Sequence, residues 1–575
     1  MSHADKKLRM VKELHRLWGM HMSRDFKVSR RDLMKGMASL GLSATAITMI
    51  MKKAPLSVKR AWAAEGATPE DRAVNAAKAM YAGAKKKTIS IMHPSGSGGN
   101  MSPFSEEWKA LTGFDVELIE VPVTQTHQKG MQEAVAQTGR YDLMLPAPLS
   151  LPDFAESGLA HDLTDWVAKY DPEVFDGPNK LEYPVSDFGQ KYKGKVYGLY
   201  CDGDWWLLNY RKDKLAEAGK SPKSKRAVVD TWAEYDQLAA DMTDKENDFW
   251  GALEYRSPFW NKFHWMTRFQ SKGVLYFDKD MKSMADSPES IKTVEDLVAI
   301  QDYMPKEQFN YGFTENYAQY YAAGRGFFEF GWPSLWRYSH DAAGAQSIIA
   351  GVDSNGEPSQ TGISKVPGDM VNGELIRADV MPFAWDFVVN RHSEIPEISY
   401  LYAQWLTGPT MSMRSIPNEG GYFDPWRNNH FLEPSEEFYA SYPGDFLATS
   451  FEAVVDCVPE IILRGGSEYH NALDINLQAA YNGQKTPAKA MADTAKEQNR
   501  ITRRLGKDTQ VEAWRALASM YPSALQKASG AITTFGAVFF LVTVITMFSS
   551  ITMLSFRLRD RTSICRSLVR IRSAD

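Results

Sequence analysis

The chain has 575 residues and a formal net charge of only −5, and no basic stripe runs through its body. This charge balance argues against nucleic acid as a partner. With both termini set aside, roughly 460 residues remain, which is enough for two sizeable lobes at the usual length of a domain.

The N-terminus is typical of an export signal. A Ser-Arg-Arg-Asp motif at residues 29–32 precedes a mildly apolar run, and small residues stand at Ala61 and Ala63. Basic residues after the apolar run favour the twin-arginine pathway over the Sec pathway. We therefore assign residues 1–63 to a twin-arginine signal peptide. An uncleaved anchor is the alternative, and translation could begin at Met20 or Met22.

Strands and helices alternate after the signal. Residues 64–87 read as an Ala-rich helical extension, and a helix around residues 105–111 ends at Gly113. A further helix is expected to place Met131, Ala134 and Val135 on one face. Strands are expected at residues 88–93, 114–121 and 141–145. This alternation predicts an α/β sheet that is mostly parallel.

Two loops follow strands of this predicted sheet, at residues 94–100 and 146–150. Ligands bind beyond the carboxyl ends of the strands in parallel α/β sheets, so both loops are expected to face one cleft. Ser97 and Asn100 are candidate contacts because a glycine-rich loop before a helix can present its N–H groups to a ligand. A plain strand-to-helix connection explains the loop equally well.

Residues 194–213, GKVYGLYCDGDWWLLNYRKD, are the most informative stretch. Two apolar strand-like runs are interrupted there by Asp202, Asp204, Trp205 and Trp206. Strand interiors seldom hold carboxylates unless these are paired or open to a cleft. The interruption therefore predicts a ligand site between two structural units, with Leu207 to Tyr210 building the second unit.

The C-terminal part of the body reads as helical, and the chain ends in an apolar segment. Thr486-Pro487 is a good helix start. No charged residue occurs from Ala528 to Phe556, and about twenty apolar residues can span a bilayer core. We expect a transmembrane helix at 530–556 and, by the positive-inside bias, a basic cytoplasmic tail at 557–575. A remnant of a neighbouring membrane-protein gene, fused by a frame change, is the alternative.

The cysteines and histidines suggest no metal or cofactor. Cys565 falls in the predicted tail, so Cys201 and Cys457 form the one possible exported disulfide, and two unpaired buried thiols are equally compatible with the sequence. No Cys or His spacing suggests zinc, iron-sulfur or haem. The sequence therefore predicts no cofactor, no metal site and no catalytic residue.

Several separated motifs make residues 87–505 resemble the extracellular solute-binding proteins of ABC transporters, in the branch that includes maltose-binding protein. They are YDLMLPAPLSLPDFAESGL at 141–159, the segment 194–213, YAAGRGFFEFGWPSLW at 321–336, YAQWLTGP at 402–409, and residues 459–483. Each is weak alone, and their order and spacing carry the likeness. The resemblance implies a type II periplasmic-binding-protein fold of two α/β lobes that close on a ligand. Its hinge strands would cross near Asp204, around residues 387–390 and after Tyr422.

The resemblance also divides the chain and names ligand contacts. Lobe 1 would comprise residues 88–203 and 388–425, and lobe 2 residues 204–387 and 426–525. The implied contacts, with Trp385 added from its expected place in the cleft, are Asp204, Trp205, Trp332, Trp336, Trp260, Phe259 and Tyr469. Aromatic faces and carboxylates together suit the C–H faces and hydroxyl edges of sugars and polyols. Asp202 is kept as a further candidate contact beside Asp204. The alternative for Asp204 is a hinge carboxylate that only caps a turn.

We therefore expect a monomeric, non-enzymatic receptor, tethered outside the cytoplasmic membrane or in the periplasm, that delivers a sugar or polyol to the permease and ATPase subunits of an ABC importer. Pro-Ala-Pro-Leu-Ser at 146–150 replaces the aromatic and charged residues of the maltose-binding branch, so a smaller ligand than maltose is expected. A polyamine or quaternary amine in an acidic aromatic box is one alternative. Another is an exported glycoside-acting enzyme, although adjacent carboxylates on one strand do not flank a scissile bond. A minor variant would also report its ligand to a membrane partner.

Overall fold

The computed structural model describes residues 66, 68–174, 189–341, 345–352, 357–381 and 384–530. The predicted signal at 1–63 and tail at 557–575 lie outside these residues, as does the predicted transmembrane helix beyond its first residue. Among the described residues, none of the helices combines the length and the apolar character needed to cross a bilayer.

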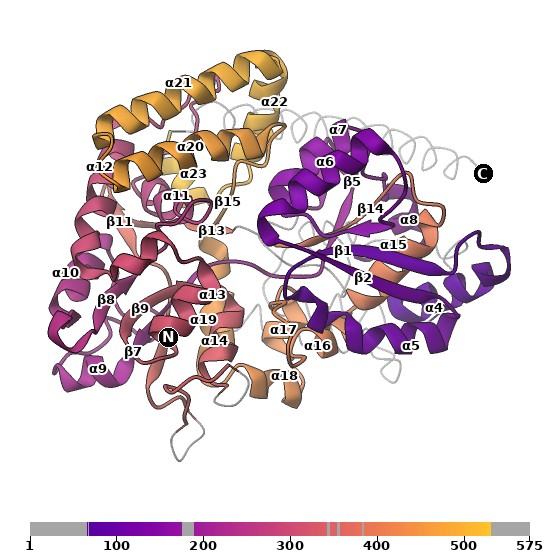
Figure 1. Cartoon of the computed structure of the whole chain (residues 1–575), viewed down its shortest axis with the longest axis horizontal. Coiled ribbons are helices and arrows are strands. Elements are labelled where there is room, and N and C mark those ends of the chain that lie inside the picture. The colour runs from indigo at the N-terminus through magenta and orange to yellow at the C-terminus, as the bar shows by residue number, and fades with distance from the viewer. Residues whose placement is uncertain are drawn as a thin grey trace, which may run out of the picture. The chain divides into compact units, whose positions relative to one another are not determined.

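The first lobe is built on a five-stranded sheet of order β2-β1-β3-β14-β6 (Figure 1). Its strands are β1 (Thr88–Pro94), β2 (Asp115–Val121), β3 (Leu143–Met144), β6 (Gly198–Tyr200) and β14 (Asp386–Val389). β1 pairs parallel with β2 and β3, Thr88 opposite Asp115 and Ile91 opposite Leu143. β14 runs antiparallel to β3 and β6. The parallel prediction is therefore confirmed for the first three strands, whereas β14 runs the opposite way because it returns from the second lobe.

Helices pack around this sheet where the sequence pattern places apolar residues. They are α4 (Pro69–Met80), α5 (Ser102–Thr112), α6 (Thr126–Ala136), α7 (Leu151–Glu156), α8 (Thr164–Tyr170), α15 (Pro396–Leu406) and α16 (Pro409–Ser415). Gly113 ends α5 in the left-handed region at φ +91°, as its sequence position predicts. The predicted face of α6 is partly wrong. Ala134 is buried, but Val135 is 86% exposed because Gly130 and Glu133, not Val135, share the buried side of the helix.

The second lobe is built on a four-stranded sheet of order β10-β7-β9-β8. Its strands are β7 (Leu207–Arg211), β8 (Trp250–Leu253), β9 (Gly326–Gly331) and β10 (Thr361–Ser364). β7 lies antiparallel to both neighbours, and β8 pairs parallel with β9. Its helices include α9 (Lys212–Glu217), α10 (Trp232–Met242), α11 (Lys262–Ser271), α12 (Pro288–Ala299), α14 (Pro333–Ser339), α19 (Phe446–Ala453) and α20 (Gly466–Tyr481).

The C-terminal part of the described chain is helical, as predicted. α21 (Pro487–Leu505) is followed by α22 (Lys507–Ala518) and α23 (Ser523–Ala528). Thr486 caps α21, its hydroxyl accepting a hydrogen bond from Lys489 N at 3.2 Å. Met491, Ala495 and Ile501 are buried along one face. This face packs α21 against α20, so the predicted helix start and apolar stripe are both confirmed.

Three short segments connect the two sheets. The first runs from β6 to β7, the second from β13 (Asp379–Met381) to β14, and the third follows α16. β13 pairs parallel with β15 (Cys457–Pro459), which makes a small two-stranded sheet of its own. The second crossing is expected around residues 387–390, but β14 of the first sheet already occupies Asp386–Val389, so the chain crosses before this strand.

Candidate functional site

Three carboxylates from two connecting segments meet between the sheets. Asp202 and Asp204 lie on the segment between β6 and β7, and Asp424 lies on the segment after α16. One carboxylate oxygen from each residue lies within 4.8 Å of the other two. Asp202 and Asp424 are 0% exposed and Asp204 is 5% exposed. The chain therefore gathers three acids at the point where it crosses from one lobe to the other.

The two acid-bearing segments pack backbone against backbone. Gly203 N donates to the carbonyl of Asp424 at 3.2 Å, and Asp424 N donates to Asp202 Oδ1 at 2.5 Å. A methyl group placed on Gly203 would lie 2.0 Å from the carbonyl oxygen of Pro425. Only glycine allows this approach. Trp206 N donates to Asp379 Oδ1 at 2.9 Å, which fixes the first segment to β13 as well.

The negative charge of this cluster has little compensation from the protein. Asp202 Oδ2 and both carboxylate oxygens of Asp424 accept no hydrogen bond. The nearby cation is Arg337 on α14, but its guanidinium donates to the carbonyls of Ile416 and Gly421, each at 2.8 Å. Burial raises the pKa of all three acids well above the usual range. The charge of Asp424 raises the pKa of Asp202 further, and Asp202 and Asp424 together raise that of Asp204, while Arg337 partly opposes the effect of burial for Asp202 and Asp424.

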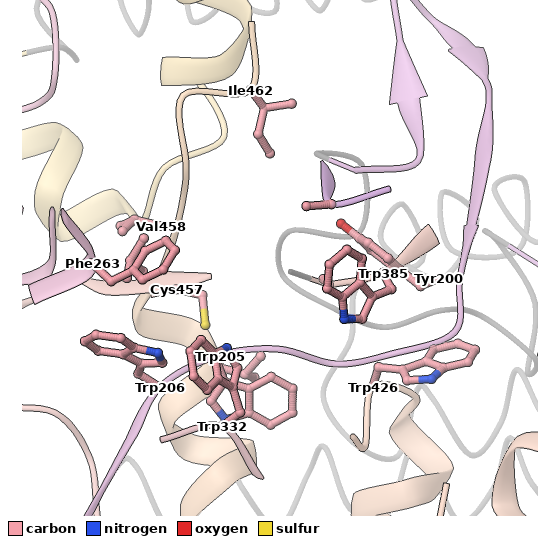
Figure 2. Packing of buried hydrophobic residues seen from close by; sticks show 14 of the residues in the cluster. Tyr200, Trp205, Trp206, Phe263, Trp332, Trp385, Trp426, Cys457, Val458 and Ile462 are labelled. Atoms are coloured by element: carbon pink, nitrogen blue, oxygen red, sulfur yellow. The ribbon is translucent and has the colours of Figure 1, made fainter. Parts of the chain in front are cut away.

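An aromatic cluster in the second lobe adjoins these acids. Trp332, at the start of α14, lies parallel to Tyr255 with ring centroids 6.4 Å apart, and Phe313 meets it edge-on at 4.8 Å. Trp206, two residues after Asp204, meets Trp332 edge-on at 5.9 Å. Figure 2 shows Trp205, Trp206, Phe263 and Trp332 gathered beside the first connecting segment. Flat rings beside carboxylates suit a ligand with apolar faces and polar edges.

A strained turn carries two more of the predicted contacts. Phe259 adopts a left-handed backbone at φ +74°, which is rare for a bulky residue. Asp474 on α20 holds the turn, its Oδ1 accepting hydrogen bonds from Phe259 N and Asn261 Nδ2, both at 2.8 Å. The following Trp260 meets Trp332 edge-on at 5.9 Å. The turn therefore brings Phe259 and Trp260 to the same aromatic cluster.

Ser97 and Asn100 hold the loop of the first lobe through their side chains. Ser97 Oγ donates to the carbonyl of Pro94 at 2.9 Å. Asn100 Nδ2 donates to the carbonyl of Ser415 at 2.7 Å, and its Oδ1 accepts from Phe423 N at 2.9 Å. Both side chains are 0% exposed. Ser97 therefore fixes the shape of the loop itself, and Asn100 fixes the loop to the third connecting segment, one residue before Asp424.

Trp205 and Trp385 lie on the first two connecting segments. Trp205 is 0% exposed, and its ring lies 5.7 Å from that of Phe431. Trp385, 2% exposed, accepts at its carbonyl from Cys201 N at 3.0 Å and from Cys201 Sγ at 3.2 Å. Cys201 and Cys457 are both buried free thiols, which answers the open question of a disulfide between them.

Trp336 and Tyr469 lie apart from this cluster. Trp336 stacks on Phe446 at 5.7 Å, and its Nε1 donates to the carbonyl of Pro443 at 3.0 Å. Tyr469, on α20, pairs its hydroxyl with Thr502 Oγ1 and accepts from Gln510 Nε2, both at 3.0 Å. The contacts of Tyr469 tie α20 to α21 and α22. Trp336 and Tyr469 therefore both have structural partners.

Asp424 and Arg337 complete the cluster although the sequence reasoning did not select them. A usable signal was present in Phe423-Asp424-Pro425-Trp426, which sets an acid among aromatics as CDGDWW does. Arg337 carried no such signal, because a lone arginine on a helix is ordinarily a surface residue. Among the described residues, Asp202, Asp204 and Asp424 also form a group that could hold a metal, since carboxylate oxygens are the ligands that Ca²⁺ and Mg²⁺ prefer.

The model of the bacterial extracellular solute-binding protein family matches residues 95–412, more than half of the chain. The chain belongs to this family. Membership confirms the predicted two-lobe fold and the predicted class, a solute-binding receptor of the ABC transporter type rather than an enzyme. The match begins just after β1 and includes the acid-bearing segment between β6 and β7 and Trp332, whereas Asp424 lies beyond its end.

Individual relatives are more distant. The erythritol/L-threitol-binding protein of Mycolicibacterium smegmatis is 22% identical over 457 residues, covering 75% of this chain and 87% of the relative. A solute-binding protein of Agrobacterium radiobacter K84 in complex with ribitol has a TM-score of 0.62 at 20% identity, covering 72% of this chain and 98% of the other. Maltose-bound MalE3 of T. maritima has a TM-score of 0.62 at 18% identity, covering 72% and 99%. At these identities the solved structures show a shared fold.

Proposed function

We propose that this protein captures a polyol or small sugar between its two lobes and delivers it to an ABC importer. The observation that carries the proposal is the meeting of Asp202, Asp204 and Asp424, on a connecting segment that continues into Trp206, whose ring meets that of Trp332. Carboxylates accept hydrogen bonds from ligand hydroxyls, and the indole covers the apolar face of the carbon chain. The erythritol/L-threitol and ribitol ligands named for two relatives belong to the same chemical class.

The ligand is small in this proposal. Pro146, Ala147 and Pro148, in the loop after β3, offer no charged or aromatic side chain, so most contacts come from the connecting segments and from the second lobe. Polar groups at a site hold the orientation of a ligand, and a short ligand needs few of them. We expect a polyol of about four to six carbons, which would need a pocket at the small end of the usual range for ligand sites.

Isothermal calorimetry against erythritol, ribitol, D-mannitol and maltose tests the proposal. We expect at least one polyol to bind and Trp332→Leu to weaken that binding about tenfold or more, as loss of a central aromatic contact does. Trp250→Leu is the matched control, since this second-lobe indole donates to Asp248 Oδ1 at 2.8 Å and belongs to a different cluster. Equal losses in both variants, or binding of none of these ligands, would contradict the proposal.

Ligand capture would draw together lobes bounded as the sequence suggests, residues 88–203 with 388–425 and residues 204–387 with 426–525. The two connecting segments that bring Asp202, Asp204 and Asp424 together support this division. Small-angle scattering with and without the bound polyol measures the change. A smaller radius of gyration with ligand is expected, and an unchanged radius would count against closure.

Export by the twin-arginine pathway and tethering by a C-terminal helix remain parts of this proposal. Support comes from Arg30-Arg31 and from the uncharged stretch 528–556. Replacing both arginines with lysine should leave the precursor in the cytoplasm. Ending the chain after Ser529 should release the exported protein from the membrane fraction. A full-length protein that is washed off membranes by carbonate would argue against the tether.

A further inference from the structure

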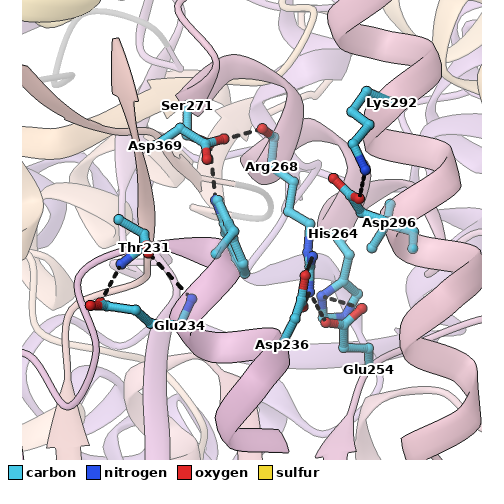
Figure 3. A network of polar contacts seen from close by, with 12 residues as sticks. Thr231, Glu234, Asp236, Glu254, His264, Arg268, Ser271, Lys292, Asp296 and Asp369 are labelled. Carbon is cyan, nitrogen blue, oxygen red and sulfur yellow. Dashed lines mark hydrogen bonds and ion pairs between the residues drawn. The ribbon is translucent and has the colours of Figure 1, made fainter. Parts of the chain in front are cut away.

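Buried carboxylates are handled in two different ways in this protein. Glu254, 0% exposed in the second lobe, has Arg256 Nη2 at 2.8 Å. Arg268 Nη2 lies 3.0 Å from its other carboxylate oxygen (Figure 3). Burial alone would raise the pKa of Glu254, but Arg268 and Arg256 hold it well below the usual range. The protein therefore neutralises this buried acid with guanidinium groups from the same lobe.

The acids between the lobes have no such partners among the described residues. Within the part of the chain that the structure describes, none of the ion pairs involves Asp202, Asp204 or Asp424, and neither Asp202 Oδ2 nor either carboxylate oxygen of Asp424 accepts a hydrogen bond. Arg337 gives its terminal N–H groups to backbone carbonyls. With all groups ionised, three negative charges face one positive charge. An ionised carboxylate out of water without a counter-charge is costly, so the site demands a positive partner.

A fourth acid, on a separate element, adds to the negative charge near the three aspartates. Glu460, one residue past β15, is 0% exposed, accepts no hydrogen bond although His470 Nδ1 lies 3.3 Å from its Oε1, and acts on Asp204 through its charge. Lys262 is the cation that balances it. The ammonium of Lys262 lies over the rings of Phe259 and Phe263, at 4.0 Å and 4.4 Å from their centroids. Glu460 and Lys262 offset one another, which leaves the excess charge on the three aspartates.

We propose that the ligand of this site is a hydroxylated amine, an amino polyol or amino sugar, whose ammonium group lies among Asp202, Asp204 and Asp424. This inference rests on the proposed function and narrows its ligand class. An ammonium donates up to three hydrogen bonds and brings the missing charge, whereas a hydroxyl group brings no charge. The ring of Trp332, which meets that of Trp206 two residues after Asp204, would cover the carbon chain.

A neutral polyol can occupy the same site only if the acids take up protons. Binding of the amine is therefore expected to release protons, and binding of the neutral polyol to take them up. The acids have raised pKa values, so a bound ammonium favours their ionised form and expels protons, while a neutral ligand favours the protonated form. Other titratable or charged groups that face the cluster are Arg337, Tyr338, Tyr422, Tyr442, Cys201 and Glu460. Of these, Glu460 shares the range near neutrality, its pKa raised to about 8 by burial.

The test is calorimetry with matched pairs that differ by one amino group, 1-amino-1-deoxy-D-glucitol against D-glucitol and D-glucosamine against D-glucose. We expect the amine of a pair to bind about 10- to 100-fold more tightly, as a charge-assisted contact to carboxylates implies. We also expect proton release on binding, measured in buffers of different ionisation enthalpy. Asp424→Asn should reduce the preference for the amine, and Asp445→Asn, a surface acid 3.0 Å from Lys225 Nζ, should not.

The possible outcomes distinguish a failure of this inference from a failure of the proposed function. Equal or tighter binding of the neutral partner, with proton uptake, overturns the inference and leaves the polyol receptor intact. Binding of none of the four compounds, and of none of the polyols above, overturns both. Calcium chloride alone is a further arm, and saturable Ca²⁺ binding that Asp424→Asn abolishes would assign the acids to a metal instead. Thermal unfolding of each variant establishes that it is folded before its affinity is compared.

Discussion

Glu254 and Asp424 are both fully buried acids, but the protein surrounds them differently. Glu254 sits on the second lobe between two arginines, and His264, whose Nε2 accepts from Tyr255 N at 3.0 Å, adds a third neighbour. Asp424 sits on a connecting segment with neither carboxylate oxygen hydrogen-bonded. Satisfied buried charges belong to the scaffold, because leaving them unpaired lowers stability. Unsatisfied buried charges at a crossing point are instead available for a ligand.

The strongest way to break this comparison is to remove the paired acid. Glu254→Gln leaves Arg256 and Arg268 as buried cations without their shared carboxylate. We expect the free energy of unfolding to fall by about 3 to 5 kcal/mol, the usual cost of stranding one partner of a buried ion pair. Urea denaturation measures it. Asp236→Asn is the control, since Asp236 also pairs with Arg268 but its side chain is 32% exposed, and it should cost clearly less.

The same acid-to-amide change should have the opposite sign at the ligand site. Asp424→Asn removes one of three mutually repelling buried carboxylates. We expect the ligand-free protein to gain about 1 to 3 kcal/mol at pH 8, the usual cost of a buried polar group without a partner. Urea denaturation without ligand measures this gain, and calorimetry should show weaker ligand binding. A loss of stability as large as that in Glu254→Gln would mean that Asp424 is a structural acid too.

The pH dependence of stability sharpens the comparison. The folded-state pKa of Asp424 is raised, so the folded protein holds protons that the unfolded chain releases, and the stability contribution of this group falls as the pH rises above the ordinary aspartate value. The stability advantage of Asp424→Asn over the parent should therefore widen between pH 4 and pH 8, by up to about 1.4 kcal/mol per pH unit and proton. Unfolding curves at four pH values measure the gap. A constant gap would contradict the raised pKa.

The smallest expected effect concerns a residue that the sequence placed at the ligand. Tyr469→Phe removes the hydroxyl that pairs with Thr502 and accepts from Gln510. We expect a loss of about 0.5 to 1.5 kcal/mol of stability per hydrogen bond broken and no change in ligand affinity. Denaturation and calorimetry on the same preparation measure both. A drop in affinity without a drop in stability would return Tyr469 to the ligand site.

Much of the fold was predictable because its determinants are local. The strands at 88–93 and 114–121 are confirmed almost to the residue, since each is a run of apolar residues bounded by a turn signal such as Gly113. Thr486-Pro487 fixed the start of α21 in the same way. The direction of β14 was beyond such reasoning, because it depends on which sheet the chain has just left.

The candidate site was partly predictable for the same reason. Asp202 and Asp204 stood out because carboxylates break an apolar pattern, and that signal survives in a single sequence. Whether a buried acid has a second arginine beside it is harder to predict, as Arg268, fourteen residues from Glu254, shows. The same limit applies more strongly to Asn100, whose partner Ser415 lies 315 residues away.

Gly203 has a consequence for how the two lobes can move. Because the backbone at Gly203 lies against Pro425 without room for a methyl group, the first and third connecting segments move as one rigid unit at that point. When the lobes rotate relative to one another, the backbone dihedral angles on either side of this unit must change. Evolutionary selection for solute binding would therefore not tolerate another residue in place of Gly203, although Gly203 has no side chain that could contact a solute.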